Sequence, residues 1–302
     1  MKELKLWTVG SISRDDIKTR DDERKDVLGG SVPYSAMAAS FFVKTGAVGV
    51  VGTDFPASFE RRWQNFNVDT SGIRRMEGRT FRWGCVYSDN MIDRKTLFTE
   101  LGVFANFKPT IPASFREAPF VLLGNIQPEL QLAVLDQARN AEFVLVDTMD
   151  YWIKNKPAEL RKVIKRATML TLNDTEARMF VGQWSLLECA ASLIQMGPKY
   201  VLIKKGEHGA MLFTEDDIFI VPAYPVRRVV DPTGAGDAYA GAFMGYLAHS
   251  GDVKDRNIHN ALLHASVVAS FGVEEFGPER FSRLTLFDIK SRVADLKHMM
   301  KV

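Results

Sequence analysis

The sequence has little cysteine and no long apolar run. Only two cysteines, Cys85 and Cys189, occur among 302 residues. Two cysteines exclude a disulfide framework, and neither has the spacing to a second Cys or to His that a zinc site needs. No apolar run approaches the roughly 18 residues of a membrane span, and the first seven residues are charged where a signal peptide is apolar. We therefore expect a cytoplasmic protein without a membrane anchor.

The sequence also lacks an excess of charge of either sign. Lys and Arg number 39 and Asp and Glu number 37, which leaves a formal net charge of +2. Proteins whose main partner is a nucleic acid usually carry a larger, clustered positive excess. With 46% hydrophobic residues the chain is not disordered either. We expect a small-molecule partner, with neither nucleic acid nor membrane involved.

Two common phosphate-binding motifs are missing. No Gly-x-x-x-x-Gly-Lys-Ser/Thr occurs, and the turn after the first predicted strand, residues 10–13, lacks the glycines that a dinucleotide needs. A NAD-dependent oxidoreductase would share the α/β pattern described next, so it stays an alternative that NADH titration would test.

Short β-type runs alternate with helical patterns along most of the chain, which is typical of a parallel sheet with crossover helices. We predict strands at 4–9, 48–51, 120–123, 143–146, 169–172 and 200–203, and helices at 34–43, 58–66, 128–140, 157–165 and 186–196. Both faces of such a sheet must be covered. The prediction is one α/β domain over residues 1–302, with a three-layer α/β/α core and a mainly parallel sheet.

One stretch, residues 68–107, has no convincing helix and contains short alternating runs broken by Gly78 and Gly84. We expect it to form a small antiparallel β lid, to which the charged segment 13–25 adds. A second sheet that projects from an α/β core is a candidate for a lid that closes over a substrate. Its exposed edge is a candidate surface for a homodimer.

The final third changes pattern again. Residues 210–221 predict a hairpin, and 226–230 a strand. Apolar positions at helical spacing predict helices over 235–247, 257–271 and 286–300.

The segment with the clearest chemistry is residues 231–237, Asp-Pro-Thr-Gly-Ala-Gly-Asp. A small-residue turn leads into a helix, so the amides of residues 234–236 lie at a helix N-terminus, where anions bind. Asp237 sits beside this site. It is either an ordinary helix-stabilising acid or a base that takes a proton from a hydroxyl attacking a phosphoryl group.

This segment resembles the C-terminal motif of the ribokinase-like or PfkB carbohydrate and nucleoside kinases, and the resemblance covers essentially the whole chain. It implies MgATP as phosphoryl donor and Asp237 as catalytic base. A silent nucleotide-binding regulator of the same fold is a further alternative. The residues implied are, for catalysis, Asp237 with Gly234, Ala235 and Gly236; for the acceptor, Asp15, Gly29, Gly30, Tyr34 and Gln127; for the nucleotide, Asn173, Lys205, Gly206, Gly209 and Thr233; for Mg²⁺, Glu176 and Asn173.

Some of these assignments have alternatives. Asn173 to Glu176 match the family's Asn-x-x-Glu element, and the same residues are an ordinary helix N-cap. Asp15 is followed by Asp16, so the acceptor ligand is one of the two. Asp231-Pro232 differs from the Asp-Thr that many members use near a monovalent-cation site, which leaves activation by K⁺ open.

The acceptor motif departs from the family pattern. Many members carry Asn where this chain has Tyr34, and often Glu where it has Gln127. The lid segment adds Phe81, Arg82, Trp83, Phe104 and Phe107. Aromatic side chains suit a flat nucleobase better than a polyol. We therefore expect a nucleoside kinase acting on the ribose 5′-hydroxyl, with a sugar kinase as the alternative.

Overall fold

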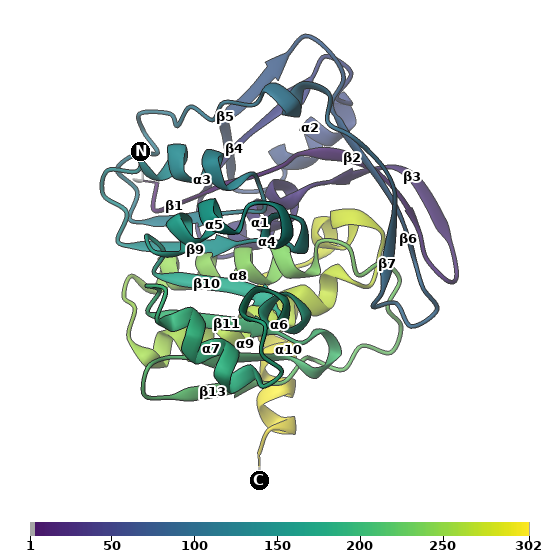
Figure 1. Cartoon of the computed structure of the whole chain (residues 1–302). Coiled ribbons are helices and arrows are strands. Elements are labelled where there is room, and N and C mark those ends of the chain that lie inside the picture. Colours follow the sequence, from purple (N-terminus) through teal and green to yellow (C-terminus); the bar gives the residue numbers. More distant parts are fainter. Residues whose placement is uncertain (1–3, 302) are drawn as a thin grey trace.

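A nine-stranded sheet forms the centre of the molecule, and the computed structural model describes residues 4–301 (Figure 1). Its strands are β1 (Leu6–Val9), β4 (Thr45–Gly52), β5 (Val68–Met76), β8 (Phe120–Leu123), β9 (Phe143–Asp147), β10 (Met169–Asn173), β11 (Tyr200–Lys204), β12 (Ala210–Phe213) and β13 (Ile218–Val221). They are ordered β13-β12-β11-β10-β9-β8-β1-β4-β5. All neighbours from β11 to β5 run parallel, which confirms the predicted sheet.

Helices cover both faces of this sheet, each over its own buried apolar cluster. One face carries α1 (Ser31–Ser40), α2 (Ala57–Gln64), α8 (Ala235–Ser250), α9 (Asp255–Gly272) and α10 (Leu286–Met299); the other carries α3 (Pro128–Leu135), α4 (Asp150–Asn155), α5 (Pro157–Ile164), α6 (Asp174–Val181) and α7 (Leu186–Ile194). In Figure 1 the second set lies in front of the sheet, and α8 and α9 lie behind it. The three-layer α/β/α prediction is confirmed.

Helices α1 and α8 pack backbone to backbone. A Cβ on Gly241 would lie 2.1 Å from the carbonyl oxygen of Ser35, and one on Gly245 would lie 2.6 Å from Cα of Ala39. Only glycine permits this approach. The two helices therefore run side by side in the same direction, which brings their N-termini together.

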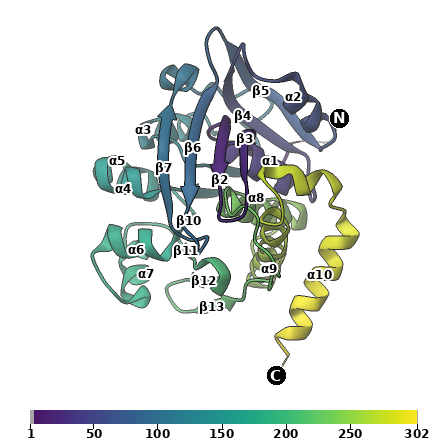
Figure 2. The same cartoon turned by 90° about the vertical axis from the view of Figure 1, so that its right-hand side faces the viewer.

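A second sheet stands across one end of the core (Figure 2). It consists of β2 (Ser13–Lys18), β3 (Glu23–Gly29), β6 (Phe81–Tyr87) and β7 (Arg94–Glu100) in the order β3-β2-β6-β7. We call these four strands the lid. Within it, β2 and β3 form an antiparallel hairpin that extends to Gly29.

One part of the predicted lid segment 68–107 is placed elsewhere. Residues 68–76 form β5, which pairs parallel with β4 at the edge of the main sheet. The error has a physical reason: a half-exposed edge strand shows the same alternation in either sheet. Only β6 and β7 of this segment belong to the lid.

Three smaller differences concern element boundaries. Residues 226–230 form no strand: the backbone N–H of Val230 donates to Val273 O in an irregular loop instead. Helix α3 ends at Leu135, short of residue 140. Short 3-10 helices lie at η1 (Gly102–Asn106), η2 (Gly206–His208) and η3 (Gly277–Arg283).

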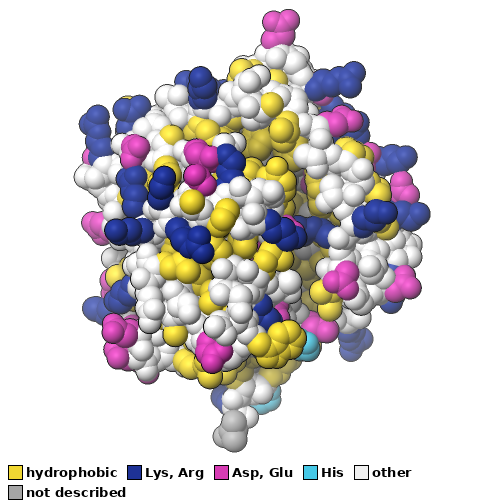
Figure 3. Space-filling model, viewed as in Figure 1, with side chains coloured by type: hydrophobic (Ala, Val, Ile, Leu, Met, Phe, Trp, Pro, Cys, Tyr) yellow, Lys and Arg dark blue, Asp and Glu magenta, His cyan; other side chains and the backbone are white. Residues whose placement is uncertain are grey.

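The surface shows no single sign of charge on the face seen in Figure 3, where basic and acidic side chains are interspersed. In the part of the chain that the structure describes, no helix has the length and apolar character needed to cross a membrane.

Candidate active site

The turn that leads into α8 has the geometry of a candidate anion site. Gly234 precedes the helix with a left-handed φ of 74°, and a Cβ there would lie 2.4 Å from the ring of Tyr34. Glycine is required on both counts. The amides of residues 234–236 thus lie at the N-terminus of a 16-residue helix, where the helix dipole favours negative charge.

Asp237 lies in the first turn of α8 and is half-buried. The pKa of Asp237 is raised to about 7 by burial and by the charge of Asp147, while Lys204 and Arg94 act to lower it. A carboxylate with a pKa near neutrality is well matched to take a proton from a hydroxyl.

Asp231 holds the turn in place. Its Oδ1 accepts a hydrogen bond from the Thr233 amide at 2.9 Å, and its Oδ2 accepts one from the Gly277 amide at 3.1 Å. The Val273 carbonyl oxygen accepts from the Asp231 amide. Asp231 therefore joins the turn to the loop that follows α9.

Asp15, on β2 of the lid, faces inward and is only 2% exposed. Its Oδ1 has no hydrogen-bond partner among the described residues. Burial raises the pKa of Asp15 to about 7, and the charges of Asp231 and Asp237 contribute. A buried carboxylate oxygen without a donor is a site at which an acceptor hydroxyl can bind.

Its neighbour Asp16 faces the other way, with both oxygens 3.1 Å from the guanidinium of Arg82. The glycines of the acceptor motif make room for Asp15. A Cβ on Gly29 would lie 1.9 Å from Asp15 Oδ2, and one on Gly30, whose φ is 90°, would lie 2.5 Å from Ser11 O.

Tyr34 lies at the start of α1 and is 1% exposed. One face of its ring lies against Gly234, and its hydroxyl has no hydrogen-bond partner among the described residues. Burial and the charges of Asp231 and Asp15 raise the pKa of Tyr34 well above its usual value. The hydroxyl is therefore the part of Tyr34 that remains available to bind a ligand.

Among the described residues, no hydrogen bond connects Gln127 to Asp15 or Tyr34. It is half-buried and directly precedes α3, at the edge where β8 ends. Three of the aromatic side chains singled out in residues 68–107 contact one another: Phe104, in η1, stacks on Phe81 and on Phe107, with ring centroids 5.3 and 5.7 Å apart.

Asn173 and Glu176 form a capping box at the start of α6. Asn173 Oδ1 accepts from the Glu176 amide at 2.8 Å, and Glu176 Oε2 accepts from the Asn173 amide at 2.8 Å. Burial raises the pKa of Glu176 to about 7. The N-cap interpretation is thus realised, and the second carboxylate oxygen of Glu176 remains for another ligand.

No group of three or more His, Cys, Asp or Glu residues suited to a metal occurs within residues 4–301. Mg²⁺ is commonly held by one or two protein oxygens together with phosphates and water. Glu176 and Asn173 supply oxygen donors of the right kind, so they fit Mg²⁺ bound in that way.

The loop after β11 lies beside the segment that leads to α8. Gly206 and Gly209 have φ values of 55° and 86°, and the Lys205 amide donates to Gly209 O at 2.7 Å. A Cβ on Gly209 would lie 2.1 Å from Val221 O. Thr233 has a different neighbour: its Oγ1 is 3.1 Å from the hydroxyl of Tyr87, on the lid.

Three charged residues at the site were not singled out from the sequence. Lys204 Nζ donates to Asp147 Oδ1 at 3.0 Å, and Arg94, on β7, lies near enough for its charge to act on Asp237 and Glu176. Asp147 and Lys204 end parallel strands β9 and β11. The sequence did hold a signal for Asp147 and Lys204, since both are charged residues at the ends of buried strands. The carboxyl ends of parallel strands meet at one edge of the sheet, so such residues are expected to lie close together.

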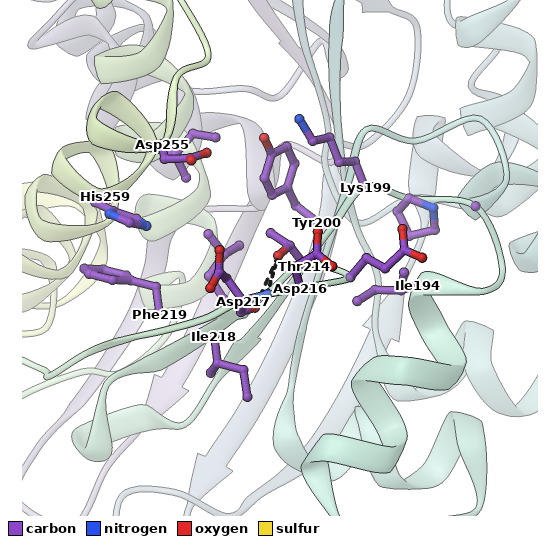
Figure 4. Close-up of a pocket in the computed structure, with 15 residues that line it drawn as sticks. Ile194, Lys199, Tyr200, Thr214, Asp216, Asp217, Ile218, Phe219, Asp255 and His259 are labelled. Atoms are coloured by element: carbon purple, nitrogen blue, oxygen red, sulfur yellow. Dashed lines mark hydrogen bonds between the residues drawn. The ribbon is translucent and has the colours of Figure 1, made fainter.

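A separate pocket of about 630 Å³ lies away from these residues (Figure 4). It is lined by the start of β11, the turn of the β12–β13 hairpin and the start of α9, including Tyr200, Asp217 and His259. Because Tyr200 and Lys204 are the two ends of one strand, this pocket and the anion site lie at opposite edges of the sheet.

The fold and this site define a phosphotransferase with an alcohol acceptor. The family model for pfkB family carbohydrate kinases matches residues 9–283, and the chain belongs to that family. A cytidine kinase from Thermococcus kodakarensis is 30% identical over 249 residues, which are 80% of this chain and 87% of that protein. A nucleoside kinase from Methanocaldococcus jannaschii is 25% identical over 252 residues, 81% of this chain and 80% of that protein.

Solved structures share the fold. A nucleoside kinase from Burkholderia thailandensis in complex with inosine superposes with a TM-score of 0.77 at 20% identity, over 96% of this chain and 98% of that one. A ribokinase-family neighbour from E. coli, solved with ATP and Mg²⁺, has a TM-score of 0.79 at 19% identity, over 97% and 99%. At these identities the likeness establishes the ribokinase-like fold.

Proposed function

We propose that the protein transfers the terminal phosphoryl group of MgATP to the 5′-hydroxyl of a nucleoside. One arrangement carries this proposal: Asp237 adjoins the candidate anion site of residues 234–236, and its charge acts on Asp15, whose buried Oδ1 has no hydrogen-bond partner among the described residues. The candidate base, anion site and hydroxyl-binding group therefore lie within electrostatic reach of one another.

The transfer is a single in-line displacement. Asp237 takes the proton from the acceptor hydroxyl as its oxygen forms a bond to the terminal phosphorus. The bond from that phosphorus to the bridging oxygen breaks, and the electron pair leaves with ADP. The amides of residues 234–236 stabilise negative charge on the moving group. Asn173 and Glu176 would hold Mg²⁺, which would neutralise charge on the phosphates.

The acceptor is assigned from two lines of support. The cytidine kinase and the nucleoside kinase both align over about four-fifths of this chain. At the candidate site, Oδ1 of Asp15 and the hydroxyl of Tyr34 are both buried and without hydrogen-bond partners among the described residues, which suits vicinal hydroxyls such as those of a ribose. These groups would equally hold a free sugar, so a sugar kinase is the second candidate.

Further properties follow from the same proposal. We place the reaction in the cytoplasm, where MgATP is available and the buried Cys85 and Cys189 stay reduced. A second copy of the chain is the candidate partner for the lid, whose β3 and β7 end the sheet order. K⁺ activation is tested by comparing turnover in K⁺ and Na⁺ salts.

The acceptor is tested with cytidine, inosine, adenosine, ribose and fructose, each with MgATP, by ADP release and by detection of the phosphorylated product. We expect a nucleoside to be turned over. Turnover of ribose or fructose with inert nucleosides would establish the sugar kinase instead. Absence of ATP consumption with every acceptor in the panel would favour a silent regulator. The Asp237→Asn variant, purified identically, controls for contaminating kinases.

A further inference from the structure

A buried ion pair lies at the edge of the sheet beside the anion site. Lys204 and Asp147 end β11 and β9, and β10 separates the two strands. Their side chains are 17% and 9% exposed, and Lys204 Nζ lies 3.0 Å from Asp147 Oδ1. Among the described residues this is the one hydrogen bond that Nζ makes. An ammonium group has three donors, so two remain available.

The ammonium group also adjoins the first turn of α8. Its Nζ lies 3.0 Å from the position that a Cβ on Gly236 would occupy. A cation beside the positive end of a helix is electrostatically unfavourable. Removing a charge pair from water costs further free energy. The helix end and burial thus disfavour this positive charge, while the neighbouring carboxylates of Asp147 and Glu176 stabilise it.

The free donors of Lys204 and its place beside the turn suit a bound anion. The anion would accept the free donors of Lys204 together with the amides of residues 234–236. Despite burial, which acts to lower it, the pKa of Lys204 is raised, because Asp147 and Glu176 stabilise the charged form. Lys204 is therefore cationic at neutral pH.

We propose that Lys204 binds a terminal phosphate of ATP at the anion site, and that Asp147 positions its ammonium group for this contact. This inference rests on the proposed function, since it requires ATP phosphates at the turn before α8. It gives the protein a phosphate-binding lysine even though the sequence has no Gly-x-x-x-x-Gly-Lys-Ser/Thr motif.

The competing explanation is that Lys204 only neutralises Asp147. Two variants separate the explanations. Lys204→Met removes the cation and leaves Asp147 unpaired, which is expected to lower stability. Adding Asp147→Asn removes the unpaired charge as well. The double variant should therefore regain stability, but it still lacks the ammonium group that would contact the phosphate.

The probe is the β,γ-imido analogue of ATP with Mg²⁺, whose affinity is measured by titration calorimetry without any acceptor. We expect Lys204→Met to weaken its binding by about 10- to 100-fold, as for loss of a hydrogen bond to a charged group. The double variant should bind as weakly, while its thermal midpoint returns toward that of the native protein. Lys199→Met, at the exposed opposite end of the same strand, is the matched control and should bind normally.

Native-like binding by the double variant would overturn the assignment, because it would show that Lys204 serves only Asp147. Native-like binding by Lys204→Met would do the same. If Lys204→Met does not fold, the double variant decides. Absence of analogue binding by the native protein would instead overturn the proposed function together with this inference.

Discussion

Three carboxyl groups of the candidate site have a pKa raised to about 7. They belong to Asp15, Glu176 and Asp237. Burial is the largest cause in every case. A raised pKa means that the folded protein favours the protonated form, so ionisation of each group costs stability. Ionisation of these three groups therefore lowers the stability of the fold, and such perturbed pKa values are common at functional sites.

The raised pKa of Asp237 predicts the pH dependence of transfer. The base acts only when ionised, so turnover should rise with pH, reach half its maximum near pH 7 and then level off. Initial rates between pH 5 and pH 9 at saturating substrates measure this. An acid limb centred near pH 4 would contradict the assignment.

Asp237→Asn keeps the shape of the side chain and removes the base. We expect turnover to fall by about 10²- to 10⁴-fold, with binding of the ATP analogue largely retained. Near-native turnover in this variant would refute the role of Asp237 without bearing on Lys204.

Asp15→Asn should stabilise the protein while impairing acceptor binding. The ionisation cost of Asp15 is absent below its unfolded-state pKa near 3.8, grows as pH rises, and is complete above about 7. The variant should gain on the order of 3 kcal/mol in free energy of unfolding at pH 8 and little at pH 4. Urea unfolding at both pH values measures this. An equal gain at both would show that the carboxylate charge is not the cause.

At the scale of elements, the start of α6 is a helix cap and, in our proposal, the Mg²⁺ site as well. The capping box of Asn173 and Glu176 satisfies backbone donors of the helix, and it fixes Glu176 at the edge where β10 ends. Gln replaces Glu at this position of a capping box without loss of the interaction.

Glu176→Gln therefore separates the cap from the metal site. We expect an unchanged or higher thermal midpoint, since the cap persists and a buried charge is gone. The Mg²⁺ concentration for half-maximal turnover at fixed ATP should rise about tenfold. An unchanged Mg²⁺ requirement would indicate that Glu176 only caps the helix.

Elements with a strong local signal were predicted closely, and elements defined by distant contacts were not. The crossover helices and buried strands follow from apolar periodicity, which depends on each segment alone. Residues 226–230 have the composition of a strand, yet Val230 and Asp231 donate to Val273, more than forty positions away in sequence. Likewise, residues 68–76 were predicted in the wrong sheet. The residue pattern of a strand does not show which strand it pairs with, and β5 pairs with β4.

At the scale of the molecule, the lid is joined to the anion site by one hydrogen bond, between the hydroxyls of Tyr87 and Thr233. The lid also packs its own apolar cluster, including Ile17 and Cys85, against Phe276. These contacts link the position of the lid to the geometry of the turn.

Tyr87→Phe should weaken this coupling by about 1 kcal/mol, which is roughly fivefold in the closing equilibrium. We expect more ATP hydrolysis per transfer, because water enters a less tightly closed site. The ratio of inorganic phosphate to phosphorylated acceptor measures it, with Tyr151→Phe as an exposed control. An unchanged ratio would show that the bond does not hold the lid.

The sequence by itself determined the layered α/β fold, the small-residue turn of residues 234–236 and the acid beside it, because these depend on local periodicity, glycine conformation and helix termini. Tertiary structure alone decided which of Asp15 and Asp16 faces the cleft, that the ring of Tyr34 lies against Gly234, and that Lys204 meets Asp147 under α8. Those contacts join residues from separate strands and helices, so they arise only when parallel strand ends and helix N-termini converge at one edge of the sheet.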